Sequence, residues 1–303
     1  MYLSESQPRN AQGFFGSFRF GSGSGTVRRY CGGRRTVRRR LADDESLERI
    51  NDVNPEGTDQ RGGRLKRVGH SESGMLDAIR PLSVELSDVW FVHWPVSPRV
   101  VRSRIPEWTE PDTVDGSAWV SALALSMDRF DVFGVPVREA VEGVNLRTYV
   151  TTPSGERAVS FLSLDVTDRL AADAARRLFR LPYHEADVRR RREGDRTEVV
   201  SRRREDSDVR LAVTFEPVGE PAPTAPDTLA SFLVERDRYV TTGPFGRRLV
   251  GSVGHPPWSV QPADVTVTER TLLDAAGVDE VEGSPLVHHS PGLEMTIGSL
   301  EPL

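Results

Sequence analysis

This sequence contains almost no cysteine and almost no lysine. Cys31 is the single cysteine among the 303 residues, so the chain cannot form an internal disulfide. A reducing, cytoplasmic location is therefore the natural expectation. Lys66 is the single lysine, and the other 39 residues of the Lys and Arg total are arginines. Chemistry that needs a lysine amine, such as Schiff-base formation, is not expected anywhere between residues 67 and 303.

Long hydrophobic runs and metal-ligand spacings are missing as well. No apolar run approaches the roughly 18 residues that a membrane-spanning helix needs, and no secretory signal is visible. The six histidines show no H-x-x-x-H spacing, and a chain with one cysteine has no C-x-x-C pair. We therefore expect no metal, no cofactor and no membrane partner.

Charge is distributed unevenly along the chain. Residues 1–72 contain 14 Lys and Arg against 9 Asp and Glu, whereas the remainder contains 26 against 36. The first part has Gly-Ser repeats at 21–25 and an Arg-rich run at 27–40, with no sustained apolar period. This composition predicts a disordered basic tail over residues 1–72. A basic tail can attract nucleic acid, but an acidic domain binds it poorly, so no nucleic-acid partner is expected.

Residues 75–303 show the pattern of a single folded domain built from many short strands. The run from Asp88 to Val96 is apolar and ends at a proline, which favours a strand. Asp168 to Leu178 is the clearest helix, with Leu170, Ala174 and Leu178 on one face. About ten strands with two or three helices and no strand–helix repeat indicate an α+β fold with an antiparallel sheet.

The most specific stretch is a hairpin around residue 153. Residues 142–150 and 158–165 are rich in strand formers, and the turn between them contains Gly155. Because strand side chains alternate, Asn145, Arg147 and Tyr149 share one face of the first strand. That polar face is either the wetted side of an antiparallel sheet or the lining of a cavity.

This stretch also resembles a known family. The residues that carry the resemblance begin with Glu142-x-x-Asn145-x-Arg147-Thr148-Tyr149-Val150. They continue with Ser163-Leu164-Asp165, Ala175-Arg176-x-x-x-x-Leu181-Pro182-Tyr183, Ser201-Arg202, Phe232–Arg236, His255–Trp258 and His288–Gly292. Together they are similar to the YqjF-like family, a conserved family of unknown function, over roughly residues 85–300. That family is grouped by fold with the acetoacetate decarboxylases.

The resemblance implies a fold more than an activity. It implies a large antiparallel sheet, shaped as a barrel or cone, around one central cavity. Acetoacetate decarboxylases use a pair of lysines that follows a proline, and one of them forms a Schiff base whose pKa is lowered by the other. Here Tyr183 and His184 follow Pro182, and neither side chain forms a stable imine.

The resemblance also implies acidic and arginine side chains in the cavity wall. Arg147 is the candidate for holding a carboxylate in a bidentate manner, and Glu142 is the candidate general base. The alternative for both is a buried, mutually satisfied ion pair. Further lining candidates are Asn145, Tyr149, Tyr183, His184, Arg202 and His289.

Three functions stay open on this basis, the first two with a small carboxylate as the expected ligand. The first is a lysine-free enzyme that uses Glu142 with Tyr183 or His184 as acid and base on a keto acid or related compound. The second is a ligand-binding or sensing module without catalysis. The third is an interaction scaffold that presents the Arg-rich hairpin of residues 183–204. The sequence leaves open whether the chain forms a homo-oligomer.

Overall fold

The structure is a computed structural model that describes residues 82–281 and 283–303. The predicted tail, residues 1–72, and the start of the predicted domain, residues 75–81, lie outside the described residues. The strands are β1 (Leu82–Val96), β2 (Glu110–Pro111), β3 (Ala118–Val132), β4 (Val135–Thr151), β5 (Arg157–Val166), β6 (Tyr183–Glu193), β7 (Arg196–Arg203), β8 (Arg210–Pro217), β9 (Ala222–Pro223), β10 (Arg238–Thr242), β11 (Arg248–Gly254), β12 (Ser259–Glu269) and β13 (Leu286–Pro302). The helices are α1 (Pro98–Arg102), α2 (Arg169–Phe179), α3 (Leu229–Val234), α4 (Thr271–Ala275) and the short 3-10 helix η2 (Pro244–Gly246).

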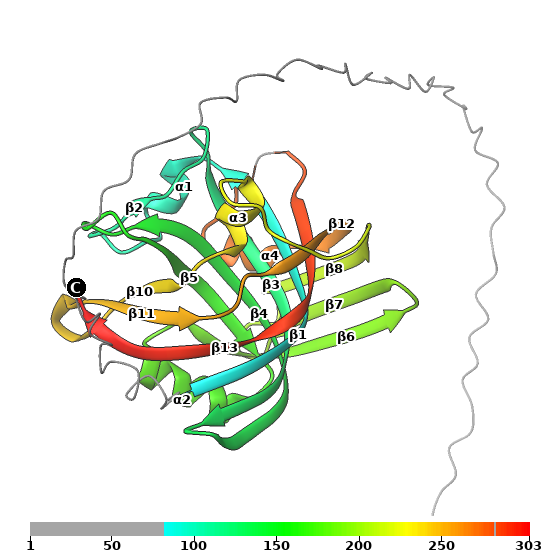
Figure 1. The fold of residues 1–303 in the computed structure, drawn as a ribbon, viewed down its shortest axis with the longest axis horizontal. Helices are drawn as coiled ribbons and strands as arrows, with labels where there is room; N and C mark the ends of the chain where they lie inside the picture. Colours follow the sequence, from blue (N-terminus) through cyan, green and yellow to red (C-terminus); the bar gives the residue numbers. More distant parts are fainter. Residues whose placement is uncertain (1–81, 282) are drawn as a thin grey trace, which may run out of the picture. The chain divides into compact units, whose positions relative to one another are not determined.

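The strands form one sheet whose pairings close on themselves. The order is β2-β4-β3-β1-β13-β11-β10-β5-β6-β7-β8-β12-β9, and additional pairings join β4 to β5 and β13 to β12. The β4–β5 pairing therefore completes a ring of strands that runs through β3, β1, β13, β11 and β10 (Figure 1). A second group, β6, β7, β8 and β12, extends from β5 and returns to β13.

The expectation of a wholly antiparallel sheet was wrong at β5. This strand pairs in parallel with both β6 and β10, and antiparallel with β4. For β6 the reason is the connection through α2, because a helix that crosses back over a sheet lets the next strand run in the same direction. The sequence analysis found no such strand–helix–strand unit, although α2 lies between β5 and β6.

Strands β1, β3 and β4 are buried on both faces. In β1, Trp90 and Trp94 belong to one hydrophobic cluster, whereas Val89 and Phe91 belong to another. The same division runs through β4, because Leu146 packs in the first cluster. Burial on both sides explains why Asp88 to Val96 reads as a continuous apolar run instead of an alternating one.

The predicted hairpin and the predicted helix are present. Thr152 to Glu156 connects β4 to β5, and Gly155 adopts the positive φ of 83° that the turn requires. Asp168 caps α2 by accepting a hydrogen bond from the Ala171 amide. The structure has four α-helices in its described part, where two or three were expected. The number is higher because α1 and α4 are single-turn helices of five residues.

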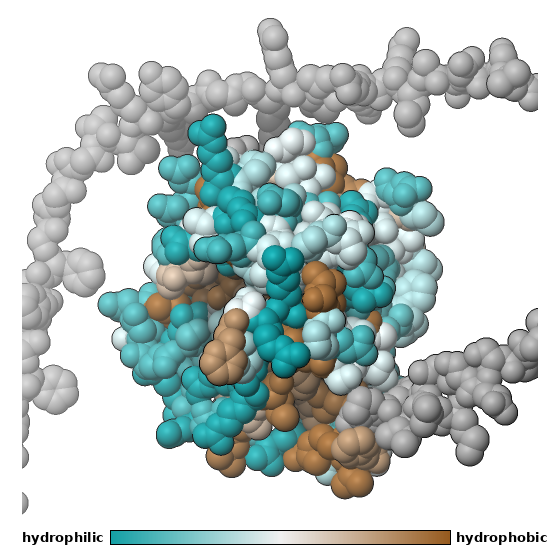
Figure 2. All heavy atoms as spheres, turned by 90° about the vertical axis from the view of Figure 1, so that its left-hand side faces the viewer, coloured by the Kyte–Doolittle hydropathy of each residue, from teal (hydrophilic) through white to brown (hydrophobic). Residues whose placement is uncertain are grey.

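The apolar face of α2 points outward. Leu170 and Leu178 are 67% and 68% exposed, and Ala172 is the buried residue of the helix. Figure 2 shows hydrophobic atoms gathered in the lower half of the face on which α2 lies. None of the helices in the described ranges is long and apolar enough to span a membrane. The cytoplasmic location stays a prediction.

A close backbone approach joins β1 to β13 beside an irregular part of β1. Gly292 pairs with Ser87, just before a register shift that includes Asp88, whose φ is 46°. The φ of Gly292 is 121°, and a Cβ atom there would lie 1.9 Å from the carbonyl oxygen of Leu86. Only glycine combines that backbone conformation with that contact.

Replacing this glycine is expected to destabilise the fold. Gly292→Ala should lower the free energy of unfolding by about 2–4 kcal/mol, since the new methyl group meets backbone atoms that cannot move away easily. Gly116→Ala is the matched control, because Gly116 also has a positive φ but open space around it; its cost should be about 1 kcal/mol. Denaturant titration measures both, and equal losses would contradict the close approach.

Candidate functional site

An interior cavity of about 130 Å³ lies on the face of β4 that carries Asn145 and Arg147. Apolar side chains from β1, β3, β5 and β13 form most of its wall. The few polar groups that line it are Asn145, Arg147, Tyr183, Arg236, Arg238, Tyr239 and His255.

Arg147 is a charged side chain inside the protein. It is 8% exposed, and its Nη2 donates a hydrogen bond of 2.8 Å to the carbonyl oxygen of Leu233. The guanidinium carbon lies 5.9 Å from the ring centroid of Phe91 and 5.7 Å from that of Tyr149. Within the described part of the chain, its Nε has no hydrogen-bond partner and no carboxylate pairs with it. A guanidinium with donors to spare in a mostly apolar cavity favours an anionic ligand.

Arg236 brings a second guanidinium to the same wall. Its Nη2 donates to Asp112 Oδ2 at 3.1 Å, and its Nε lacks a partner among the residues described. Burial lowers the pKa of Arg236 to about 10. Arg157 donates to the same Asp112 oxygen at 3.0 Å. Arg157 and Arg236 therefore share one carboxylate, and Arg147 contacts none among the described residues, which leaves an excess of positive charge.

A chain of hydrogen bonds fixes the carbonyl group that Arg147 uses. Tyr149 Oη donates to Leu233 O at 2.6 Å, Ser121 Oγ lies 2.7 Å from Tyr149 Oη, and His93 Nδ1 lies 2.6 Å from Ser121 Oγ. The Tyr149 hydroxyl has one proton, which it donates in the hydrogen bond to the Leu233 carbonyl oxygen. Ser121 must therefore donate to Tyr149, and the Nδ1–H of His93 must donate to Ser121.

This chain is electrically neutral and has a positioning role. Burial, together with the charges of His288 and Arg147, holds the pKa of His93 well below its ordinary value. The hydroxyl group of Tyr149 is fully used within the chain. The side chain shares the cavity side of β4, as alternation predicted, but it does not line the cavity. Its contact with a ligand is not supported, because it holds the Leu233 carbonyl instead.

Two tyrosine hydroxyl groups complete the polar lining. Tyr239 is 2% exposed, and its hydroxyl has no hydrogen-bond partner in the described ranges. Its ring lies over Gly251, where a Cβ atom would come within 2.2 Å of the ring. Burial raises the pKa of Tyr183 to about 12 and also raises the pKa of Tyr239. Both hydroxyls are therefore protonated donors at neutral pH.

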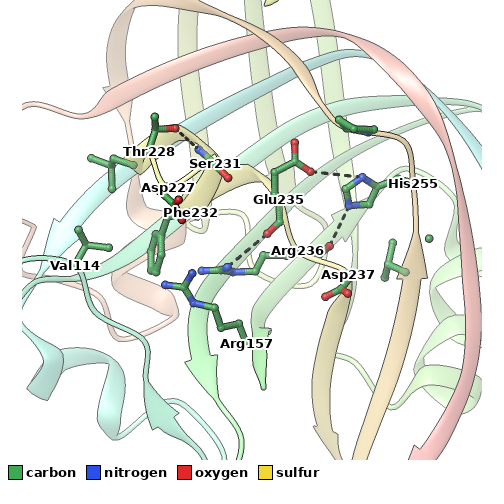
Figure 3. A pocket seen from close by; sticks show the side chains of 14 residues that line it. Val114, Arg157, Asp227, Thr228, Ser231, Phe232, Glu235, Arg236, Asp237 and His255 are labelled. Atoms are coloured by element: carbon green, nitrogen blue, oxygen red, sulfur yellow. Dashed lines mark hydrogen bonds and ion pairs between the residues drawn. The ribbon is translucent and has the colours of Figure 1, made fainter. Parts of the chain in front are cut away.

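A larger open pocket of about 700 Å³ adjoins the cavity (Figure 3). Arg236, Val253 and His255 line both hollows, so a single layer of side chains separates them. Figure 3 shows the guanidinium groups of Arg157 and Arg236 close to the ring of Phe232. His255 is held by a contact of 3.2 Å between its Nε2 and the Arg236 carbonyl oxygen.

Glu142 does not meet Arg147, which corrects the expectation that the two would share a cavity wall or an ion pair. The residues are five positions apart on β4, so their side chains lie on opposite faces of the sheet. Glu142 accepts a hydrogen bond from Ser126 Oγ at 2.7 Å and pairs with Arg190 Nε at 3.1 Å. Its carboxylate is therefore occupied, and it does not line the cavity.

His289 joins the Glu142 side. Its Nε2 lies 2.9 Å from Asp88 Oδ1, and its Nδ1 lies 2.9 Å from Gln261 Nε2. Its ring contacts that of Trp90, with centroids 4.1 Å apart and the ring planes tilted by 34°. Burial raises the pKa of Asp88, but the hydrogen bond from His289 and the charge of Arg190 outweigh this and lower it. The cluster ties β1, β6, β12 and β13 together and leaves His289 away from the cavity.

His184 and Arg202 also lie away from the cavity. His184 follows Tyr183 on β6 and therefore points to the other side of the strand, where it contacts Glu205. Arg202 is an exposed residue of β7. Several other arginines of the β6–β7 hairpin pair with acids inside the domain, such as Arg203 with Asp165. Of the eight predicted site residues, the cavity wall contains Asn145, Arg147 and Tyr183.

Sequence reasoning missed Arg236 and Tyr239. Both lie in or beside the Phe232–Arg236 motif that carried the family resemblance, so a signal was available. The spacing within that motif gives no hint of burial, because Arg236 follows the end of α3 in an irregular segment. Among the described residues, no group of three or more His, Cys, Asp or Glu could hold a metal ion.

Solved structures share this fold at low sequence identity. The enduracididine biosynthesis enzyme MppR complexed with pyruvate aligns with a TM-score of 0.54 and 14% identity, over 76% of this chain and 93% of that chain. Acetoacetate decarboxylase from Legionella pneumophila aligns with a TM-score of 0.52 and 10% identity, over 73% and 86%. The expected acetoacetate decarboxylase-like fold is confirmed, and identities this low show likeness of fold alone.

Sequence comparison gives a nearer relationship. The uncharacterized protein YqjF of Bacillus subtilis (strain 168) is 35% identical over 208 residues, which are 67% of this chain and 85% of YqjF. The sequence model of the DUF2071 family, described as an uncharacterized conserved protein, matches residues 83–294. The resemblance to the YqjF-like family is thereby confirmed. This chain belongs to the DUF2071 family of uncharacterized conserved proteins.

Proposed function

We propose that this protein binds a small organic carboxylate in its interior cavity and that Arg147 holds the carboxylate group. The observation that carries the proposal is the buried Arg147 guanidinium, which has a free Nε and no carboxylate partner in the described residues. Burying a charge without a counter-charge costs several kcal/mol. A carboxylate ligand supplies that counter-charge through paired N–H···O bonds.

The surrounding charges support an anion over a neutral ligand. Arg236 stands on the same cavity wall, and its lowered pKa of about 10 records the cost of keeping a guanidinium in this environment. An anion beside it would reverse that cost. Asp112 neutralises one charge, although it serves both Arg157 and Arg236.

The tyrosine hydroxyls point to a second acceptor oxygen on the ligand. The hydroxyl of Tyr239 is buried without a partner among the described residues, and an unused buried donor costs about 1–3 kcal/mol. A ligand oxygen beyond the carboxylate would satisfy it. MppR, a fold neighbour, has been solved in complex with pyruvate, a small carboxylate with one further oxygen.

Binding without turnover is the function we propose. Of the three residues predicted as acid or base, Glu142 and His184 are held in contacts outside the cavity. Tyr183 lines the cavity, but a pKa of about 12 makes it a hydrogen-bond donor at neutral pH and not a base. Residues 67–303 contain no lysine, so imine chemistry has no amine to use.

Removing the Arg147 guanidinium should weaken carboxylate binding strongly. Hydrogen bonds to charged groups contribute about 1.5–3 kcal/mol, so Arg147→Ala should weaken pyruvate binding by about ten-fold to a hundred-fold. Arg147→Lys keeps the charge but loses the bidentate geometry. Its affinity for pyruvate should lie between those of the wild type and Arg147→Ala. Isothermal titration measures the affinities, and circular dichroism confirms that each variant is folded.

Arg202→Ala is the matched control for this experiment, because Arg202 is an exposed arginine of β7 outside the cavity wall. It should leave pyruvate affinity unchanged. Pyruvate binding that survives Arg147→Ala, or that Arg202→Ala reduces equally, would show that the carboxylate is held elsewhere.

Tyr239→Phe should separate stability from binding. The ligand-free variant should be as stable as the wild type or up to about 1 kcal/mol more stable, because a buried unpaired hydroxyl has been removed. Its affinity for pyruvate should fall about five-fold. Its affinity for propionate, which lacks the keto oxygen of pyruvate, should not change. Thermal melting and titration with both acids provide the readouts. An equal loss of affinity for both acids would argue against a hydrogen bond from Tyr239 to the keto oxygen.

A further inference from the structure

The inner cavity is much smaller than the pocket that adjoins it. Its volume of about 130 Å³ contrasts with about 700 Å³ in the open pocket that adjoins it. Arg236, Val253 and His255 form the shared boundary. A ligand whose carboxylate reaches Arg147 therefore extends past Arg236 into the outer pocket if it is longer than a few atoms.

The outer pocket has acidic groups that the protein itself does not use. Asp227 and Asp237 are exposed carboxylates that line it, and neither forms an ion pair with any residue in the described ranges. Glu235 lines it too, with Oε1 occupied by Thr224 and by the Trp258 amide. Figure 3 shows Glu235 and Asp237 on the same side as His255, across the pocket from Val114.

Positive groups in the outer pocket are already partly neutralised. Arg157 and Arg236 both donate to Asp112, which leaves one net positive charge from these three groups. Asp227, Glu235 and Asp237 bring three negative charges, so the lining is acidic overall. Arg236 is nevertheless 8% exposed with a free Nε, which directs an anion to the inner boundary.

The inner cavity therefore favours a negatively charged group, whereas the adjoining outer pocket favours a positively charged one. An acidic entrance repels a simple anion that must pass it to reach Arg147. A ligand with a cation at its outer end removes this conflict, because the cation stays beside the free carboxylates. Phe232, Val253 and Pro257 supply apolar wall for the hydrocarbon that joins the two ends.

From this arrangement we infer that the ligand is an amphoteric acid, with a carboxylate in the inner cavity and an ammonium or guanidinium group in the outer pocket, at Asp227 on the Val114 side or at Asp237 on the His255 side. This inference rests on the proposed carboxylate-binding function and adds the chemical class of the ligand. Different residues bind the two charged groups of the ligand, so each contact is testable separately.

The test compares two acids that differ only at the outer end. Valerate and δ-aminovalerate are titrated into the full-length protein at low salt. The amino acid should bind about five-fold more tightly, which is the upper range for a solvent-accessible ion pair. The advantage should shrink at high salt and should be absent for β-alanine against propionate, because the shorter chain cannot reach both hollows.

A double variant assigns the effect to the outer carboxylates. Asp227→Asn with Asp237→Asn should reduce the advantage of δ-aminovalerate to less than about two-fold, while valerate affinity stays the same or rises. Asp264→Asn is the matched control, since Asp264 is an exposed aspartate of β12 outside both hollows. It should leave the advantage intact.

Each outcome decides between the two ideas. Equal affinity of the wild type for both acids would overturn the amphoteric ligand but leave carboxylate binding in place. An advantage that persists in the double variant would also overturn it, because the cation would then lie elsewhere. If none of pyruvate, propionate and valerate binds, the proposed function itself fails, and the inference fails with it.

Discussion

A guanidinium group buried in an apolar cavity, without a carboxylate beside it in the described chain, is the constraint on which the rest of the structure depends. Charges are normally paired when they leave water, because desolvation costs more than ordinary contacts return. Here the protein offers the carbonyl oxygen of Leu233 and two aromatic faces. The neutral chain through Tyr149, Ser121 and His93 fixes that carbonyl and brings no negative charge.

Alternation along β4 allows such a site to exist beside a network of ion pairs. The Glu142 face is closed by Arg190, Asp88 and His289, which fasten four strands together. The Arg147 face is hollow and has donors left over. Because the sheet separates the two faces, the negative charge of Glu142 does not neutralise Arg147. The result is a protein whose acidic structural cluster and basic cavity occupy opposite sides of the same strand.

The sequence predicted the local elements and the family well, and it predicted the site in part. The β4–β5 hairpin, α2 with its Asp168 cap, and the fold expected from the family resemblance are all present. Alternation placed Asn145 and Arg147 together, and the cavity contains both. The same rule, applied to Glu142, would have shown that it faces the other way. Glu142 was placed in the cavity wall with Arg147 on the strength of the family resemblance instead.

Other errors had causes that a single sequence does not reveal. Tyr183 and His184 are neighbours, and strand geometry sends one into the cavity and the other toward Glu205. Arg236 and Tyr239 reach the cavity through long-range contacts, because β10 pairs with β5 and β11 inside the ring and α3 packs in the same hydrophobic cluster, which no local pattern records. The outward apolar face of α2 was also unforeseen, because periodicity identifies a stripe but not what covers it.

The central claim is that Arg147 binds the carboxylate of a ligand and not a carboxylate of the protein. Nitrogen-15 NMR of the arginine Nε–H groups observes this directly, with the Arg147 signal assigned by its disappearance in Arg147→Lys. On titration with pyruvate, the account predicts a saturable change in that signal, while the Arg202 signal stays constant. An Arg147 signal that does not respond to any carboxylate would contradict the account.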